Sequence, residues 1–327
     1  MLKRSIYMMT VFFLAMLLWQ CGRGPESMSS DMSRRLAMMP ASDGLVYVNL
    51  DQIRASDFYQ LFLDSLDGKM SHDRRMSEFI EITGVDPRKD VQEIYAAVNP
   101  GKGSGEERFL AVVIGRYDPE KVIRYIEEND QHQKLAREDY NGLTLFSDAH
   151  GNGPSFAFVD NRQAVVGSRE WVKSWLDQNK SGKGGNAANR DLATDVKYKN
   201  GAWMVLNAGE MVDEFMNEMG RSPEVRRFSA LEAIEKVNLS FSFTDRILMD
   251  GSGRFTDAAN AELFRDAVKG LLAAAKLTVS GDRDAVDVIN KIDISTDKNQ
   301  VRINTEMTRR DLEKMIRQRH KGMARHF

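Results

Sequence analysis

The sharpest change in the hydrophobic pattern of the chain lies at its N-terminus. An apolar run covers residues 6–19, with Lys3 and Arg4 before it and Cys21 two positions after its end. A short basic segment, an apolar core and a processing site are typical of a secretory signal. The run is shorter than the roughly 20 residues that span a bilayer. We therefore interpret residues 1–20 as a signal peptide, with an uncleaved N-terminal anchor as the alternative.

Two segments in the first half of the chain are apolar at nearly every position. They are residues 95–98 and 109–114. Near-continuous apolar runs of this length are typical of strands that are buried on both faces. The pattern predicts a sheet that is covered on both sides, either by helices, by the second half of the chain, by a partner or by a lipid.

The second half of the chain shows a different pattern, in which apolar and polar residues alternate. Residues 237–243 and 301–307 have a strict period of two. This period is typical of an antiparallel sheet with one packed face and one solvated face. The polar face is a candidate contact surface, and it is equally consistent with an ordinary solvent-exposed face. Its candidate residues are Asn238, Ser240, Ser242, Arg302 and Asn304.

Several helix ends can be read from local residue types. Asp118 is followed by Pro119, which is the pattern of an N-cap and the first helical residue. Ser168 and Thr308 are similar candidate caps, and each precedes an apolar stripe with helical spacing. Gly84 is expected to end the helix that carries Met76, Phe79 and Ile80.

Three local matches, in the same order, indicate that the chain contains two copies of one unit. They pair residues 45–49 with 203–207, 115–118 with 253–256, and 168–172 with 308–312. The predicted fold class is α+β, with two duplicated units that each pack a mainly antiparallel sheet against helices. The expected element order of each unit is β-αα-ββ-α-ββ-α. The expected divisions are unit one at 41–178, a linker at 179–200, unit two at 201–318 and a basic tail at 319–327.

The segment Leu18-Trp19-Gln20-Cys21 resembles the lipobox of bacterial lipoproteins. The match rests on Leu18 and Cys21, and it departs from the usual pattern at Gln20 and Trp19. The resemblance implies that the signal is cut before Cys21 and that this cysteine carries the lipid. Residues 21–40 would then be a flexible tether. The body weakly resembles uncharacterised secreted bacterial proteins with repeated α+β units, which implies a fold and no activity.

Composition and charge narrow the class of protein. Cys21 is the only cysteine in 327 residues, so no disulfide can form within the chain. Removal of Lys3 and Arg4 with the signal leaves 44 basic residues against 48 acidic residues. This balance argues against general binding of nucleic acid, which needs a strongly basic surface.

One basic cluster lies at the C-terminus. It could contact anionic lipid headgroups, at about 1 kcal/mol for each basic residue near the surface. The alternative is a solvated helix face that ends in a frayed tail. The residues of this candidate membrane contact are Arg317, Arg319, Lys321 and Arg325.

No motif in the sequence assigns catalytic, cofactor-binding or metal-binding residues. The glycine-rich segments 101–105 and 181–185 lack the phosphate-loop spacing. The five histidines do not form the paired spacing of a zinc site, and no Gly-x-Ser-x-Gly motif occurs. We therefore expect a non-enzymatic protein without a cofactor.

These patterns together predict an exported lipoprotein of the bacterial cell envelope that faces the periplasm. Gly22 after the cysteine favours the outer membrane over the inner one. The expected function is binding or scaffolding, with a membrane contact through the N-terminal lipid and an envelope protein or lipid as partner. One alternative is a carrier of lipid or another hydrophobic ligand, with a cavity lined by Tyr95, Phe109 and Val113. A second alternative is a hydrolase with a dispersed site, which needs a histidine and an acid side by side.

Overall fold

The structure of the chain is a computed structural model. It describes residues 28–61, 63, 74–100, 107–129, 135–149, 153–182, 186–209 and 229–314. Within these ranges, no helix combines the length and the apolar character that crossing a membrane requires.

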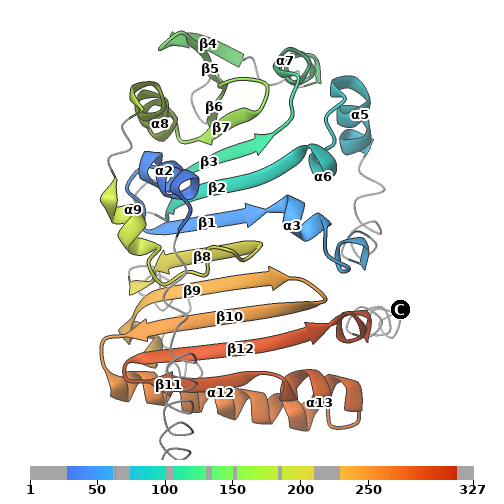
Figure 1. Cartoon of the computed structure of the whole chain (residues 1–327), viewed down its shortest axis with the longest axis vertical. Helices are drawn as coiled ribbons and strands as arrows, with labels where there is room; N and C mark the ends of the chain where they lie inside the picture. The colour runs from blue at the N-terminus through green and yellow to red at the C-terminus, as the bar shows by residue number, and fades with distance from the viewer. Residues whose placement is uncertain are drawn as a thin grey trace, which may run out of the picture.

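The described strands form one twelve-stranded antiparallel sheet (Figure 1). Its order is β11-β12-β10-β9-β8-β1-β2-β3-β7-β6-β5-β4, so the two halves of the chain lie on either side of the β1–β8 pair. The fold is therefore α+β with a large antiparallel sheet. The strands are β1 (Gly44–Asn49), β2 (Val91–Asn99), β3 (Arg108–Gly115), β4 (Leu135–Tyr140), β5 (Leu143–Asp148), β6 (Ser155–Phe158), β7 (Gln163–Gly167), β8 (Ala202–Asn207), β9 (Ile234–Phe243), β10 (Arg246–Phe255), β11 (Asp293–Asp297) and β12 (Gln300–Thr308).

The helices begin and end largely where the local residue types predicted. Asp118 accepts a hydrogen bond from the Lys121 amide and caps α7, and Gly84 adopts a positive φ of 71° directly after α5. The helices are α2 (Ser30–Met38), α3 (Leu50–Arg54), α5 (Arg74–Thr83), α6 (Pro87–Asp90), α7 (Pro119–Asn129), α8 (Arg169–Ser181), α9 (Ala187–Leu192), α12 (Ala258–Thr278) and α13 (Arg283–Asn290), with a 3-10 turn η1 (Ser229–Ala233).

Two neighbours in the central strand β1, Val46 and Tyr47, define the two faces of the sheet because successive side chains of a strand point to opposite sides. We call these faces the Val46 face and the Tyr47 face. The registers of β1 with β2 and β8 place Tyr95 and Trp203 beside Tyr47. The same registers place Ala96 and Met204 beside Val46.

The main hydrophobic core lies on the Tyr47 face of the first half of the sheet. Helices α2, α8 and α9 cover this face and insert Leu36, Trp175 and Leu192 against the strands. Strands β1, β2, β3 and β8 contribute buried residues from the opposite side of the core, and Tyr47 packs between Tyr95 and Trp203. Strand β3 approaches β7 so closely that a Cβ on Gly167 would lie 2.2 Å from the carbonyl oxygen of Phe109.

A second, smaller core lies on the Val46 face of the second half of the sheet. Helix α12 packs Ala261 and Phe264 against Phe255, Ile294 and Val301. Figure 1 shows α12 and α13 at the lower end of the sheet, far from α2 and α8. The two halves of the sheet therefore have their main hydrophobic clusters on opposite faces.

The expected tether at residues 21–40 is wrong for its C-terminal half. Ser29 caps α2, and Met32 and Leu36 lie one helical turn apart on a buried face. Leu36 belongs to the main core, and Met28 packs against the same core. The spacing of Met32, Leu36 and Met39 carried this signal, because buried residues four and three positions apart are typical of an amphipathic helix.

The expected linker at residues 179–200 also contains packed structure. Asn186 caps α9, and Leu192 and Val196 are buried in the main core. Asn189 is fully buried and donates hydrogen bonds to the carbonyl oxygens of Met39 and Pro40, at 3.1 and 2.8 Å. Burying an amide without such partners would be costly, so this segment is fixed to the chain that precedes β1.

The observed element order differs from the expected one in both halves. An additional hairpin, β4–β5, precedes β6, and its two-residue turn is Asn141-Gly142 with φ values of 61° and 83°. Asn-Gly is the strongest short signal for such a turn. In the second half, two helices instead of one lie between β10 and β11, because Asp282 caps a separate helix, α13.

Candidate functional site

The register of the sheet brings the five candidate contact residues to one face. Asn238, Ser240 and Ser242 lie in β9, and Arg302 and Asn304 lie in β12. Strand β10 runs between them: Asp250 pairs with Ser240 on one side and with Asn304 on the other. All of these residues lie on the Tyr47 face, because Trp203 of β8 pairs with Ser240.

The predicted solvent exposure of this face is wrong at its centre. Asn238 is 9% exposed and Ser240 is 5% exposed, and Lys236 on the same face of β9 is also buried. The apolar residues between them, Val237 and Leu239, are half-buried and therefore more exposed than their polar neighbours. The alternation of residue types correctly predicted that β9 is a strand and which of its side chains share a face. The prediction that the polar face is the more exposed one is wrong in the centre of β9.

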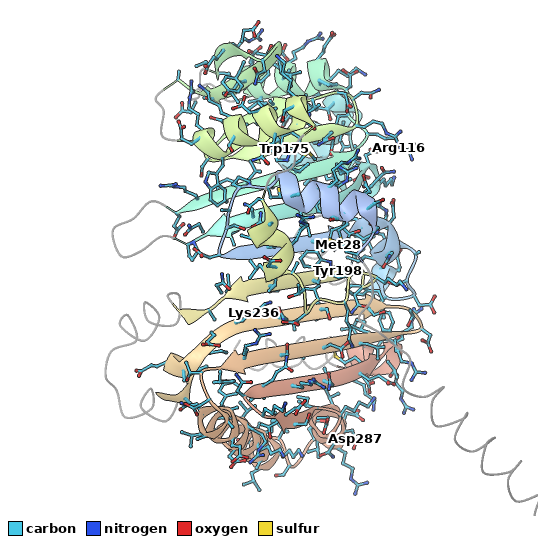
Figure 2. The ribbon with its side chains drawn as sticks, turned by 60° about the vertical axis from the view of Figure 1, so that its left-hand side comes forward. Met28, Arg116, Trp175, Tyr198, Lys236 and Asp287 are labelled. Carbon is cyan, nitrogen blue, oxygen red and sulfur yellow. The ribbon has the colours of Figure 1, made fainter. Side chains whose placement is uncertain are left out.

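The segment that follows α9 explains this burial. Asp195 accepts hydrogen bonds from Lys236 Nζ at 3.3 Å and from Arg254 Nη2 at 2.8 Å. Lys197 Nζ lies 2.6 Å from Asp250 Oδ1. These ion pairs hold residues 193–200 to the polar face of β9 and β10 and supply the partner that a buried lysine requires. Figure 2 shows Tyr198 and Lys236 in this region.

Three buried polar atoms in or beside this region have no hydrogen-bond partner among the described residues. They are Trp203 Nε1, Asn200 Nδ2 and Asn238 Oδ1. A buried donor or acceptor that stays unsatisfied costs about 1–3 kcal/mol. These two donors and one acceptor are the polar groups here that remain available to an ordered water molecule or a small polar group.

The Val46 face has the opposite character, since it is apolar and incompletely covered in the centre of the sheet. Val46, Met204, Leu239, Phe241 and Met249 follow one another across four strands, and all five are half-buried. Beyond them, α12 begins to cover the face. The result is an apolar surface that continues from the middle of the sheet to this helix.

Helix α12 is apolar on its outer side as well as on its packed side. Leu263, Leu271 and Leu277 are 54%, 51% and 77% exposed. Arg265 donates a hydrogen bond to Thr296 Oγ1 in the edge strand β11 and so marks the flank of the helix nearest that edge. At 100° per residue from the packed residues Ala261 and Phe264, Leu271 falls on the opposite flank, toward the central strands, and Leu263 and Leu277 lie on the side that points away from the sheet. Leu271 therefore extends the apolar surface of the Val46 face toward α12.

The cavity expected for a hydrophobic ligand does not form from its three proposed residues. Phe109 pairs with Val98 and Val113 pairs with Ile94, which places both on the Val46 face. Tyr95 pairs with Val112 and lies on the Tyr47 face, inside the main core. Phe109 is exposed at its edge of the sheet. In β3, the Tyr47 face is packed in the main core and the Val46 face is only partly covered, so the sheet is not fully covered on both sides as the sequence predicted.

A pair of tyrosines and one carboxylate form a polar cluster at the edge of the main core. The hydroxyls of Tyr47 and Tyr95 donate to the two carboxylate oxygens of Glu93, at 3.0 and 3.1 Å. Burial and the nearby Glu93 charge raise the pKa of Tyr47 to about 12 and also raise the pKa of Tyr95. Both hydroxyls therefore remain protonated donors at neutral pH and serve to fix Glu93 in place.

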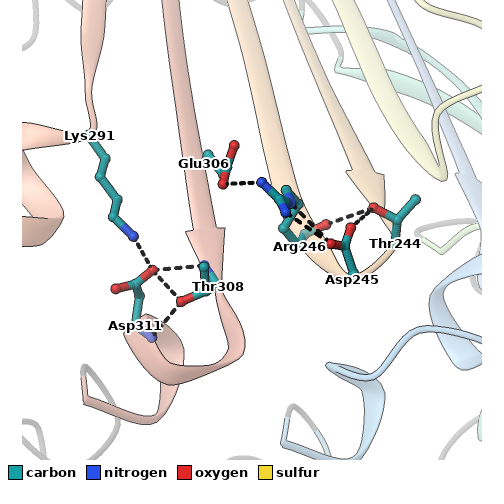
Figure 3. Close-up of polar contacts among 7 residues, drawn as sticks. All are labelled: Thr244, Asp245, Arg246, Lys291, Glu306, Thr308 and Asp311. Carbon is teal, nitrogen blue, oxygen red and sulfur yellow. Dashed lines mark hydrogen bonds and ion pairs between the residues drawn. The ribbon is translucent and has the colours of Figure 1, made fainter.

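The C-terminal end of β12 is held by a separate polar network (Figure 3). Asp311 Oδ2 accepts hydrogen bonds from the Thr308 amide at 2.8 Å and from Lys291 Nζ at 2.5 Å. Thr308 Oγ1 in turn accepts from the Asp311 amide, which confirms Thr308 as the cap of the helical segment at residues 309–314. Burial alone would raise the pKa of Asp311, and the hydrogen bonds from Lys291 and Thr308 outweigh it and lower the pKa to about 2.

Several candidate residues lie outside the described parts of the chain. These include the proposed lipidation residue Cys21 and all five histidines. The proposed membrane-contact residues Arg317, Arg319, Lys321 and Arg325 also lie outside them. Within the described ranges, no group of three or more His, Cys, Asp or Glu side chains is placed to hold a metal ion.

The residues that sequence reasoning missed are the charged ones that close the polar face, namely Lys236, Asp195 and Asp250. Lys236 precedes Asn238 by two positions, so the period of the strand already placed it on the same face. Asp195 and Lys197 carry no comparable signal, because their contacts are with residues 41 and 53 positions further along the chain.

Comparison with known proteins gives a similarity of fold. No known family model matches the chain, and no curated protein matches it. Crystal structures of the treponemal protein TP0453 are similar in fold. Crystal form III has a TM-score of 0.51 at 10% identity and covers 83% of this chain and 92% of its own. Crystal form IV has a TM-score of 0.49 at 10% identity, with 86% and 94% covered.

Proposed function

We propose that the protein is an exported, lipid-anchored lipoprotein of the bacterial envelope that faces the periplasm and binds or scaffolds another molecule. The observation that carries the proposal is the placement of Cys21, the only cysteine of the chain, two positions after the end of a basic and then apolar N-terminal segment. A cysteine that carries several acyl chains holds a protein stably on a membrane, whereas a single chain does not. Gly22 favours the outer membrane.

The surface of the sheet supports binding as the function. Soluble proteins rarely expose large contiguous apolar areas, and such areas often mark interaction sites. Among the described residues, the half-buried apolar centre of the Val46 face and the exposed Leu271 beside it support a binding surface of this kind.

The arrangement of the strands supports a duplicated body. Outward from the centre, one half has the order β1-β2-β3-β7-β6 and the other has β8-β9-β10-β12-β11. If β4 and β5 are left out, each half has five strands. In both halves the fifth strand along the chain lies between the third and the fourth strand in the sheet. The 158-residue offset between the first matched segments places Met204 at the position of Val46, and these two residues pair directly. A duplication related by a two-fold axis at this pair accounts for both observations, with the β4–β5 hairpin as an addition to unit one.

Fractionation of cells that express the full chain tests the lipid anchor. We expect the protein to incorporate a palmitate analogue and to sediment with the membrane, and we expect Cys21→Ala to lose both properties. Gln20→Ala is the matched control, because it brings the segment closer to the lipobox pattern and should keep both. Membrane association of Cys21→Ala through an uncleaved N-terminus would contradict the proposal.

A second candidate function, a carrier of a hydrophobic ligand, is favoured by the half-buried apolar centre of the Val46 face. Mass spectrometry of lipids that co-purify with the protein tests it. We expect bound lipid to decrease in Phe241→Ser, which removes an apolar group from this face, and to persist in Ser242→Ala on the opposite face. Purified protein without any bound lipid would contradict this function. The hydrolase alternative gains no support from the described residues.

The basic C-terminal residues remain a proposed second contact with the membrane. Replacement of Arg317, Arg319, Lys321 and Arg325 by glutamine removes up to about 1 kcal/mol of attraction per residue. We expect weaker binding of the unlipidated chain to anionic vesicles. Unchanged binding would contradict this contact.

A further inference from the structure

The outer side of α12 carries a line of apolar and small residues that points away from the sheet. Leu263 and Leu277 are 54% and 77% exposed, and Gly270 lies midway between them, seven positions from each. Seven positions make nearly two full turns of a helix, so the three residues follow one line along α12. Ala273 and Ala274 are also exposed and lie beside this line. We call these five residues the outer stripe.

The packing of one chain does not account for the glycine at the centre of the outer stripe. Glycine inside a helix is less favourable than alanine, because it loses more conformational freedom on folding. Apart from its own helix, a Cβ at position 270 would meet no atom of the described residues within 4 Å. A larger side chain would therefore fit in the single chain. A glycine at this point does, however, allow the backbone of a second helix to approach closely.

The outer stripe is complementary to a reversed copy of itself. In two antiparallel helices related by a two-fold axis at Gly270, each residue faces the one that lies equally far on the other side of Gly270. Leu263 of each copy then packs against Leu277 of the other copy. Ala267 lies opposite Ala273 in the same way. The two exposed leucines thus cover each other at both ends, and the small residues meet in the middle.

The charges beside the outer stripe are complementary in the same arrangement. Glu262 and Lys276 lie on the flank of α12 that Arg265 marks, and the two-fold axis brings this flank against itself. Glu262 of one copy is then offset by about 3 Å along the helix from Lys276 of the other. Within one helix the same two residues are about 21 Å apart and cannot pair. A parallel, in-register dimer keeps that separation and forms neither ion pair.

One pair of like charges lies near the proposed axis, where Lys269 of each copy comes close to Lys269 of the other. Asp266 lies one turn before Lys269 on the same helix, and the charge of Lys269 contributes to lowering the pKa of Asp266. Two lysines and two aspartates therefore gather at the centre, and their charges balance.

We infer that a second copy of this chain binds at the outer stripe, with the two α12 helices antiparallel and lying between the two sheets. A single pair of helices falls below the roughly 1,000 Å² expected of a stable complex. The dimer is therefore weak: it forms at high local concentration and dissociates in dilute solution. This inference goes beyond the proposed function and does not depend on lipidation of Cys21.

Cysteine cross-linking of the full chain in the cell envelope tests the arrangement, with copper–phenanthroline as the oxidant. We expect Gly270→Cys to form a covalent dimer. Leu263→Cys and Leu277→Cys, co-expressed with tags of different mass, should cross-link to each other. Leu263→Cys alone is the matched control, because its two copies are about 21 Å apart and a disulfide needs Cα atoms within about 7 Å. The natural chain, with Cys21 alone, gives the background.

A charge reversal tests the proposed ion pairs in the Gly270→Cys variant. Glu262→Lys and Lys276→Glu should each lower the cross-linked fraction several-fold, because each places like charges together at both ends of the interface. The two changes combined should restore the cross-linked fraction. Pairing within one chain cannot explain such a rescue, since the two residues are about 21 Å apart in α12.

Three results would overturn the inference. Cross-linking of Leu263→Cys alone, at the level of the mixed pair, would show a parallel or random contact. Absence of cross-linking in both Gly270→Cys and the mixed pair would show that another molecule, or another part of this chain, covers the outer stripe. Failure of the double charge reversal to restore the cross-link would show that Glu262 and Lys276 do not meet across the interface.

Discussion

The two halves of the sheet are closed in different ways, although they share one continuous set of strands. In the first half, α2, α8 and α9 cover the Tyr47 face with large apolar side chains. In the second half, the same face carries Lys236, Asn238 and Ser240, and ion pairs to residues 193–200 close it. The comparison shows that a polar strand face can be buried when charged partners arrive from another part of the chain.

The consequence of this difference is that the two halves should respond differently to mutation. The stability of the first half, which we call the apolar half, depends on the volume of its core side chains. The stability of the second half, which we call the polar half, depends on the pairing of its charges. The predictions below separate these two modes, from the largest expected effect to the smallest.

The largest loss in the free energy of unfolding is expected for a mutation in the apolar half. Trp175 is almost fully buried between α8 and the sheet. Trp175→Ala should lower the free energy of unfolding by about 3–5 kcal/mol, because it removes a large buried side chain and leaves a cavity. Denaturant unfolding, followed by circular dichroism, measures this. A loss below about 1 kcal/mol would contradict the assignment of the main core to this face.

The polar half should be sensitive to the loss of a single charge. Asp195→Ala leaves the buried Lys236 without its nearest acid, and we expect a loss of about 2 kcal/mol. This is less than for a fully buried pair, because Asp195 is partly exposed. Lys236→Met is the control, since it removes the buried charge itself and should be close to neutral. Equal losses in both variants would show that packing, and not charge pairing, closes this face.

Acid should weaken the C-terminal end of the polar half. The pKa of Asp311 is about 2 in the folded protein, against the ordinary value of 3.8 that applies to the unfolded chain. The stabilisation by ionised Asp311 is therefore complete above about pH 5 and is lost as the pH falls through 3.8 toward 2. We expect the difference in unfolding free energy between the natural protein and Asp311→Asn to shrink by about 1–2 kcal/mol over this range. A difference that does not change with pH would contradict the network in Figure 3.

The smallest effect is expected on the outer side of α12. Leu277 is largely exposed, so Leu277→Ser should change the free energy of unfolding by no more than about 0.5 kcal/mol. Leu176→Ala in the main core is the comparison, with an expected loss of about 2–5 kcal/mol. Similar losses in the two variants would show that Leu277 is covered in the folded protein.

The sequence predicted most of the strands, although not the β4–β5 hairpin, and several helix ends, because these depend on local patterns. Asp118, Gly84 and Thr308 act as helix signals for reasons that lie within four residues of each. The alternation in 237–243 correctly predicted which side chains share a face.

The sequence could not predict which face is covered, because that depends on distant segments. Burial of Asn238 and Ser240 follows from residues 193–200, and the position of that segment follows from Asn189 and its contacts with the chain before β1. Two further features do have local signals: the helical spacing of Met32 and Leu36 marks α2, and Asn141-Gly142 marks the β4–β5 turn.

The central claim is that Cys21 is the lipidated first residue of a mature envelope protein. Mass spectrometry of the N-terminal peptide, from protein purified out of the cell envelope, tests it most directly. The account predicts a peptide that begins at Cys21 and carries a diacylglycerol group and an amide-linked acyl chain. A peptide that begins before residue 21, or an unmodified Cys21, would contradict it.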